Sequence, residues 1–339
     1  MSGKLVSQPL VSVVTPFHNT AQYLPECIES VLGQTYSLFE YILVDNCSTD
    51  GAGAIAESYA SRDPRVRLIR QPALLPQVQN YNSALTHISD TSLYCKIVQA
   101  DDYIFPECLR LMVQAFEQSE RIGLVSAYDL KGDVVRGSGF PRSSTMLPGR
   151  ETARLYLRGG VWAFGSPTTV MYRSSLVRNG GPFYDESLLH EDTEKCFQIL
   201  ERWDFGFVHQ VLSFLRTGNE SISSGARAFQ PGLLDWYILV RRYAKVFFSP
   251  VEAAALEEAA RRSYYGMLAH RAIRSRDAAF WRYHTEGLKT LPETLDRRYL
   301  ALKICKDLLH MAANPGRIIR GLWRRSSLEQ AGDRCTAGH

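Results

Sequence analysis

The first 125 residues alternate between two hydrophobic periods, and this alternation restricts the fold more than any other feature of the sequence. Short runs rich in β-branched and apolar residues recur at 11–15, 40–45, 66–69, 93–98 and 123–126. Between them lie segments of helical period, near residues 24–32, 51–61, 77–88 and 106–118. Strands that alternate with helices of about 10–15 residues form βαβ units. The pattern therefore predicts an α/β fold with a mainly parallel central sheet.

The remainder of the chain predicts further parts. Residues 131–158 are rich in Gly, Ser and Arg and predict a mobile excursion, followed by strands at 166–172 and 205–214 and a helix at 191–203. Beyond residue 225 the pattern becomes helical, and Ser249, Pro250 and Glu252 predict a capped helix start. We expect a leader at 1–8, the α/β domain at 9–228, a helical C-terminal region at 229–315 and a basic tail at 316–339.

Bulk composition argues against several classes of protein. The formal net charge of +4 is too small to favour nucleic acid as a partner. The seven cysteines include no C-x-x-C pair, which argues against a disulfide framework or a structural zinc site and fits a reducing compartment. The sequence contains neither a signal-peptide core nor a run of about 18 apolar residues. These features predict that the chain works in the cytoplasm.

Three polar segments follow directly on predicted strands, at residues 15–19, 45–50 and 99–103. Ligands bind beyond the carboxyl ends of the strands in parallel sheets, so we expect these segments to share a site. An aromatic ring such as Phe17 can stack on a nucleobase there, although an ordinary strand end would look the same. Asp45 can accept a hydrogen bond from the imide N–H of a uracil, whereas Asp50 fits a helix N-cap.

Two pairs of acids are candidates for the chemistry. Asp101 and Asp102 are adjacent, repel one another and need a cation or solvent to compensate. Hard divalent cations such as Mg²⁺ and Mn²⁺ bind carboxylate oxygens together with substrate phosphates, although a solvated turn before Pro106 would also explain the pair. Glu191 and Asp192 open a helix, where the helix dipole favours acids and where a carboxylate can also serve as a general base.

The order and spacing of these motifs resemble the family 2 glycosyltransferases of GT-A fold. The resemblance covers roughly residues 9–220 and is carried by T-P-F-H-N at 15–19, V-D-N-C-S-T-D at 44–50, N-S-A-L at 82–85, A-D-D-Y-I-F-P at 100–106 and H-E-D-T at 190–193. It implies a nucleotide-sugar donor, a divalent metal (Mn²⁺ or Mg²⁺) and a glycan or lipid-linked acceptor.

The resemblance also implies roles for individual residues. Asp101 and Asp102 would bind the metal, with Asp102 as the principal ligand. Asp192 would be the general base, with Glu191 beside it. The nucleotide would be bound by a larger set, made up of Thr15, Pro16, Phe17, Asn19, Asp45, Asn82 and Asp101.

The chain departs from the family pattern at three places. Gln99 stands where the usual D-x-D-D motif has its first acid, so the metal would depend on Asp101 and Asp102. Tyr81 stands where an arginine often precedes the asparagine of the third motif. The segment 216–221 lacks a histidine that many relatives carry there, which leaves one accessory contact to metal or phosphate in question.

These features predict an inverting glycosyltransferase that moves a hexose or related sugar from a nucleotide diphosphate donor, expected to be a UDP-sugar, to an acceptor hydroxyl. The expected setting is the synthesis of a bacterial-type surface polysaccharide or glycan. Two alternatives stay open. A sugar nucleotidyltransferase should have a glycine-rich basic loop, which residues 15–23 do not supply. A catalytically inactive nucleotide-sugar-binding module would not need the acids Asp101, Asp102 and Asp192.

Two further segments allow both a functional and a structural interpretation. Trp162 and Phe164 can offer an aromatic platform to the acceptor sugar or can belong to the core. At 100° per residue, residues 317–325 separate into an apolar and a basic face. The basic amphipathic tail at 316–339 therefore predicts either peripheral contact with an anionic membrane or a helix packed on its own domain.

Overall fold

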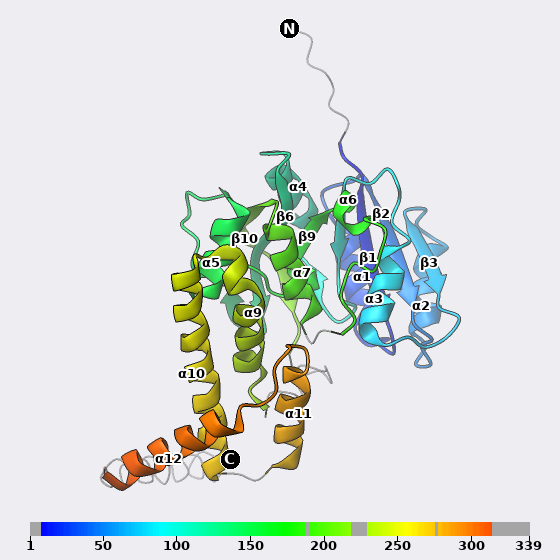
Figure 1. Ribbon diagram of the computed structural model, residues 1–339. Coiled ribbons are helices and arrows are strands. Elements are labelled where there is room, and N and C mark those ends of the chain that lie inside the picture. Colours follow the sequence, from blue (N-terminus) through cyan, green and yellow to red (C-terminus); the bar gives the residue numbers. More distant parts are fainter. Residues whose placement is uncertain (1–7, 188–189, 218–228, 275–276, 314–339) are drawn as a thin grey trace, which may run out of the picture. The chain divides into compact units, whose positions relative to one another are not determined.

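The computed structural model describes residues 8–187, 190–217, 229–274 and 277–313 (Figure 1). Within these ranges the chain divides into two compact units. The first is drawn from residues 1–227 and 242–253, and the second from residues 228–241 and 254–339. The predicted tail at 316–339 and most of the predicted leader lie outside the described residues.

The first unit is built on a sheet whose longer strands share one direction. Parallel pairing joins β2 to β1 and β3, β1 to β4, and β6 to β10. Their bounds are β1 Val11–Phe17, β2 Phe39–Asp45, β3 Val66–Arg70, β4 Tyr94–Ile97, β6 Ile122–Lys131 and β10 Asp204–Leu215. The carboxyl ends of these strands therefore meet at one edge of the sheet, which we call the carboxyl edge. The opposite edge is the amino edge.

Four shorter strands make the sheet mixed rather than purely parallel. The strand order is β3-β2-β1-β4-β9-β6-β10-β5, with β7 paired to β6 and β8 to β10. Each short strand runs antiparallel to its neighbours, and β9 lies between the two parallel groups. Their bounds are β5 Tyr103–Ile104, β7 Val134–Arg136, β8 Met146–Leu147 and β9 Val170–Arg173. The predicted α/β fold class with a largely parallel sheet is confirmed.

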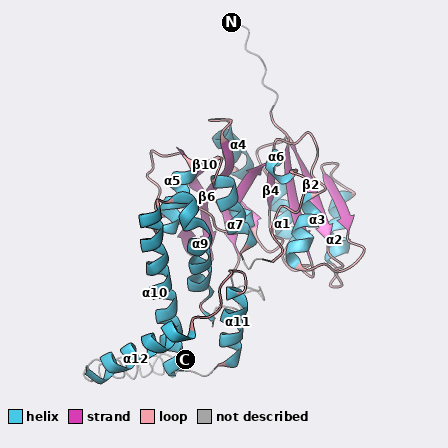
Figure 2. Ribbon diagram, viewed as in Figure 1, coloured by secondary structure: helices cyan, strands magenta, loops and turns pink. Residues whose placement is uncertain are grey.

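Helices cover both faces of this sheet (Figure 2). Helices α1 (Leu24–Leu32), α2 (Ala52–Ala60) and α4 (Cys108–Phe116) bury their apolar sides against strand residues in one continuous core cluster. Helices α3 (Gln77–Leu85), α5 (Gly149–Leu157) and α7 (Glu191–Leu200) cover the other face, together with the short α6 (Ser174–Val177). The strands are buried on both faces, as expected of a sheet between two helical layers.

The segment 131–158 is not the mobile excursion that its composition predicts. It contains β7, β8 and the helix α5, and α5 buries Ala153, Tyr156 and Leu157. The Tyr156 ring stacks on Phe164 with 5.0 Å between ring centroids. The segment is rich in Gly, Ser and Arg, so its composition does not indicate a helix. It nevertheless contains a short amphipathic helix, because its few apolar residues lie on one face.

The C-terminal part is helical, as predicted. Its helices are α9 (Pro231–Phe247), α10 (Pro250–Arg274), α11 (Ala278–Leu288) and α12 (Arg297–Ala313). The predicted capping box opens α10, since the Ser249 N–H donates to Glu252 Oε2 at 3.2 Å and the Glu252 N–H donates to Ser249 Oγ at 3.4 Å. Within the second unit, Tyr237 stacks on Tyr264 with 4.9 Å between centroids. No helix among the described residues is long and apolar enough to cross a membrane.

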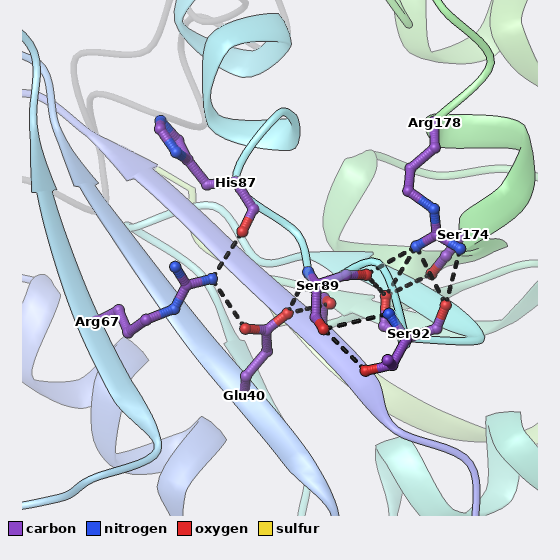
Figure 3. A network of polar contacts seen from close by, with 9 residues as sticks. Glu40, Arg67, His87, Ser89, Ser92, Ser174 and Arg178 are labelled. Carbon is purple, nitrogen blue, oxygen red and sulfur yellow. Dashed lines mark hydrogen bonds and ion pairs between the residues drawn. The ribbon is translucent and has the colours of Figure 1, made fainter.

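The amino edge of the sheet is closed by a hydrogen-bonded network (Figure 3). The Glu40 carboxylate accepts the Ser12 hydroxyl and the Ser89 N–H, both at 2.6 Å, and the Arg67 guanidinium at 2.9 Å. Arg178 donates to the carbonyls of Ser89 and Ser92 at 2.8 and 3.2 Å. The network joins the starts of four strands, so this edge is a structural seam.

Candidate active site

The loops after β1 and β2 are tied together at the carboxyl edge. Asn19 adopts a positive φ of 52°, and its Oδ1 accepts the Thr49 N–H at 2.8 Å. The Asn19 N–H donates to the Ser48 hydroxyl at 3.1 Å, and the Ala21 N–H donates to Asp50 Oδ2 at 2.7 Å. The first two motifs of the sequence are therefore part of one surface.

The residues expected to line a base pocket are buried in this structure. The Thr15 hydroxyl lies 3.0 Å from Tyr41 Oη, and Pro16 is buried in the same strand. Phe17 is 2% exposed and belongs to the core beneath α1, α2 and α4. A ring with so little accessible surface has no open face for a nucleobase. The structure thus favours a core role for Phe17, and base stacking stays a prediction.

Asp45 has a structural role that the sequence context does not reveal. Its Oδ1 accepts the Ser48 N–H at 2.8 Å, which closes the turn after β2. Its Oδ2 lies over Gly53, where a Cβ would approach to 2.5 Å, so glycine at this position leaves room for the carboxylate. Asp45 is therefore held in a fixed orientation at the carboxyl edge, and its bond to a base stays a prediction.

The two adjacent acids after β4 lie in different environments. Asp102 is buried, its Oδ2 accepts the Thr168 hydroxyl at 2.7 Å, and its Oδ1 accepts the Arg216 N–H at 3.1 Å. Burial, together with the charge of Asp101, raises the pKa of the Asp102 carboxyl to about 7. Asp101 is only half-buried. This difference favours Asp101 as the residue that meets a ligand, whereas the sequence points to Asp102 as the principal one.

A buried lysine supports this turn from below. Lys96 lies in β4, is 0% exposed, and donates from Nζ to the Thr168 carbonyl at 2.6 Å. Thr168 therefore connects Lys96 to Asp102, and its hydroxyl also accepts the Gln99 N–H at 3.1 Å. A charged residue inside an apolar strand needs such partners. A lysine within an otherwise apolar strand is the sequence feature from which Lys96 could have been predicted.

Arg216, at the end of β10, is a second residue that sequence reasoning did not assign to the site. Its Nε donates to the Asp101 carbonyl at 3.0 Å, and its guanidinium forms an ion pair with Glu26. The guanidinium also lies 4.8 Å from the centre of the Tyr23 ring. Arg216 thus braces the backbone of the Asp101–Asp102 turn against α1.

The chain offers few ligands to a metal at this edge. Among the described residues, no three His, Cys, Asp or Glu side chains gather in a metal-binding cluster. Magnesium-type sites often use one or two carboxylates and complete their coordination with substrate phosphates and water. The half-buried Asp101 fits that role, and Asp102 stands next to it with both oxygens already hydrogen-bonded.

The second acid pair begins α7, and both its carboxyls are half-buried. Burial, together with the charge of Asp192, raises the pKa of Glu191 to about 7, and burial also raises the pKa of Asp192. Raised values of this kind suit a general base that works near neutral pH. Burial raises the pKa of the Tyr81 phenol, and the charges of Glu191 and Asp101 add to that rise. Both acid segments thus act electrostatically on Tyr81.

Asn82 binds protein backbone. The resemblance predicts contact with the nucleotide, but Asn82 Nδ2 donates to the Tyr184 carbonyl at 2.9 Å and Oδ1 accepts the Tyr184 N–H at 2.8 Å. Both ends of the carboxamide are engaged in this way. The geometry thus gives Asn82 a role in holding the segment before α7, and a nucleotide contact is not supported.

The two aromatic residues expected to contact the acceptor lie in different environments. Phe164 is 2% exposed and packs on Tyr156 and Phe197, so it belongs to the core. Trp162 is 42% exposed, with Arg136 about 6.0 Å from its ring. Only Trp162 therefore keeps accessible ring surface that a sugar could contact.

A largely parallel sheet with loops and acids gathered at its carboxyl edge defines an α/β fold of GT-A-like type. Residues 12–181 match the family described as Glycosyl transferase family 2, and the chain belongs to this family. The protein class is thus a glycosyltransferase.

A curated relative agrees with that assignment, and solved structures share the fold. The chain is 29% identical to glycosyltransferase GlyG of Streptococcus pneumoniae over 198 residues, which cover 53% of this chain and 64% of GlyG. It thus matches less than two thirds of that relative's length. The fold resembles TarS of S. aureus in complex with UDP-GlcNAc (TM-score 0.55, 19% identity, 83% and 79% of the two chains). It also resembles the mannosyltransferase PcManGT of Pyrobaculum calidifontis with GDP-Man and Mn²⁺ (TM-score 0.52, 17% identity, 89% and 88%).

Proposed function

We propose that this chain is an inverting, metal-dependent glycosyltransferase that moves a hexose or related sugar from a nucleotide diphosphate, most simply a UDP-sugar, to an acceptor hydroxyl. One observation carries the proposal: Tyr81 accepts a hydrogen bond from Gln99, which begins the Asp101 turn, and its ring also contacts Tyr184 in the segment before Glu191 and Asp192. The segments that carry the donor-side acid and the base-side acid thus meet at one residue. A single-displacement transfer needs such an arrangement.

The transfer step follows from these residues. Asp192 accepts the proton of the acceptor hydroxyl while the hydroxyl oxygen attacks the anomeric carbon of the donor sugar. The nucleoside diphosphate leaves from the opposite side. One displacement inverts the anomeric configuration. A divalent ion held at Asp101, with Asp102 beside it, would supply neutralisation of the diphosphate charge.

The donor proposal draws on the neighbours as well as on the site. TarS and PcManGT were solved with UDP-GlcNAc and with GDP-Man and Mn²⁺. Asp45, which the Ser48 N–H holds at the end of β2, is the proposed acceptor for a base N–H such as the imide of uracil. Trp162, with 42% of its surface exposed, supports contact with a glycan or lipid-linked acceptor, and polysaccharide synthesis is the proposed setting.

The test is a panel of nucleotide sugars with Mn²⁺ or Mg²⁺, followed by release of the nucleoside diphosphate and by NMR of the glycosidic product. The proposal expects metal-dependent release with one donor and an inverted anomeric centre. A retained configuration would refute the mechanism. Binding without any release would indicate the inactive module, and pyrophosphate release from a nucleoside triphosphate and a sugar phosphate would indicate the nucleotidyltransferase.

We also propose that the chain works at the cytoplasmic face of a membrane, with the basic tail at 316–339 as its contact. The last described helix supports this, because Leu302 and Leu309 of α12 are 72% and 71% exposed. Arg298 and Lys306 are exposed on the same helix, whereas Asp307 is half-buried 3.5 Å from Lys303. Leucines bordered by cations suit an anionic lipid interface.

Flotation with anionic liposomes at low salt tests the membrane contact. We expect the full chain to float, and we expect loss of flotation on removing residues 316–339 or on changing both leucines to serine. Equal recovery of all three proteins in the soluble fraction would refute the contact.

A further inference from the structure

Two neighbouring residues of α3 connect the donor side of the site to the base side. Asn82 forms the first connection. Its carboxamide donates to the Tyr184 carbonyl at 2.9 Å and accepts the Tyr184 N–H at 2.8 Å, so it pairs with that residue as a strand neighbour would. The backbone of Tyr184 is therefore fixed to α3 by a side chain that has both a donor and an acceptor.

Tyr184 belongs to the surroundings of the base. Its side chain is 0% exposed, and burial raises the pKa of its phenol well above the usual value. Its ring lies 4.8 Å from the Phe183 ring, and Lys195 of α7 lies 5.0 Å from that same ring, so Tyr184 packs beside the helix that Asp192 opens. A shift of Tyr184 would thus move one wall around the proposed base.

Tyr81 forms the second connection. Its hydroxyl accepts the Gln99 Nε2–H at 3.0 Å and the Gln77 Nε2–H at 3.3 Å. Its ring meets the Tyr184 ring edge-on, with 6.2 Å between centroids. Tyr81 therefore contacts the turn that carries Asp101 and also Tyr184, which packs beside α7.

Gln99 and Tyr81 are two of the positions at which the sequence departs from the family pattern. The two residues are hydrogen-bonded to each other, so the two departures meet in one contact. An amide paired with a phenol joins α3 to the turn without adding a charge. The turn is thereby held in place without a third acid next to Asp101 and Asp102.

We propose that Tyr81 and Asn82 are positioning residues that set the separation between the donor-side turn at Gln99–Asp102 and the proposed base at Asp192. This inference rests on the proposed function, because it gives the pair a role in the transfer step. Neither residue needs to touch substrate. Their loss should therefore lower the rate of transfer more than the affinity for the donor.

The experiment compares Asn82→Ala and Tyr81→Phe with Gln79→Ala in the full chain. Gln79 is the matched control, since it lies one turn earlier on α3 and reaches the same segment at Glu186 (2.9 Å) without bonding to Tyr184. We expect kcat to fall about tenfold in the first two variants with the donor KM within about twofold, and both to stay near wild type in Gln79→Ala. Equal kcat values in all three variants would overturn the inference.

Hydrogen exchange supplies a readout that does not depend on activity. The Tyr184 N–H should lose protection in Asn82→Ala but keep it in Gln79→Ala, while the thermal unfolding of both variants stays cooperative. Unchanged protection at Tyr184 in Asn82→Ala would overturn the inference even if the wild type catalyses transfer. If the wild type transfers no sugar from any donor, the proposed function fails, and the exchange result still decides whether Asn82 fixes this segment.

Discussion

The two edges of the central sheet carry charged side chains in opposite arrangements. At the amino edge, Glu40 is surrounded by a guanidinium, a hydroxyl and a backbone N–H, so its charge is stabilised where it stands (Figure 3). At the carboxyl edge, Asp102, Glu191 and Asp192 all have raised pKa values, because burial disfavours their charged forms.

This difference separates a structural edge from a reactive one. Acids that are kept partly destabilised are typical of functional sites, whereas satisfied ion pairs mainly hold the fold together. Both edges are formed by the same strands, since β2 carries Glu40 near its start and Asp45 at its end. The predictions below use charge removal at each edge to test this comparison.

The largest effect is expected at Asp101. Asp101→Asn should lower metal-dependent transfer by about 10³-fold, because loss of a metal ligand removes several kcal/mol of charge stabilisation in the transition state. Asp102→Asn should lose less, since its buried carboxyl is engaged with Thr168 and Arg216. Steady-state rates against Mn²⁺ concentration distinguish the two acids. A larger loss in Asp102→Asn would restore Asp102 as the principal ligand.

Asp192 comes next. Asp192→Asn should reduce transfer by about 10²-fold or more through loss of the general base, while donor and metal still bind. Single-turnover transfer and donor binding by calorimetry measure the two separately. Glu191→Gln is the matched variant, and the assignment is wrong if it is the crippled one while Asp192→Asn stays active.

Asp102 should also make the stability of the metal-free protein depend on pH. Its folded pKa of about 7 lies above the ordinary value of 3.8, so the folded state binds more protons between these values. The resulting stability is fully present below about pH 4 and is lost as the pH rises through about 7. Asp102→Asn should flatten this dependence and raise the free energy of unfolding at pH 8. Urea unfolding in EDTA at pH 5 and pH 8 measures both, and an unchanged slope would contradict the burial argument.

Removal of the Glu40 charge at the amino edge should lower the free energy of unfolding, whereas Asp102→Asn raises it, and the change should be smaller. Glu40→Gln replaces charge-assisted hydrogen bonds to Arg67, Ser12 and Ser89 by neutral ones, which should lower the free energy of unfolding by about 1 kcal/mol. The rate of transfer per folded molecule should not change. A stabilised Glu40→Gln protein, or one with a lower kcat, would break the distinction between the two edges.

Much of this architecture could be predicted from the sequence, because apolar runs and helical periods report burial directly. The strands near residues 11–15, 40–45 and 66–69 were recognisable in this way. The antiparallel direction of β9 was not, since strand pairing depends on contacts far along the chain. Helix α5 was hidden for another reason: its few apolar residues lie in a stretch rich in Gly, Ser and Arg.

The site could be located from the sequence more readily than its residues could be given roles. The position of acids after strands predicts the carboxyl edge. It does not show that Asp102 is buried under Thr168, that Phe164 is part of the core, or that Asn82 holds the Tyr184 backbone. Each of these roles depends on a partner between 66 and 102 residues away along the chain or on packing from several helices.

The most direct test of the account is the thermal shift caused by a nucleoside diphosphate, with and without Mn²⁺, in the wild type, Asp101→Asn and Glu40→Gln. The account predicts a Mn²⁺-dependent rise in Tm for the wild type, the same rise from a lower starting Tm for Glu40→Gln, and no Mn²⁺-dependent rise for Asp101→Asn. An undiminished rise in Asp101→Asn, or its loss in Glu40→Gln, would contradict the claim that the donor binds at the carboxyl edge.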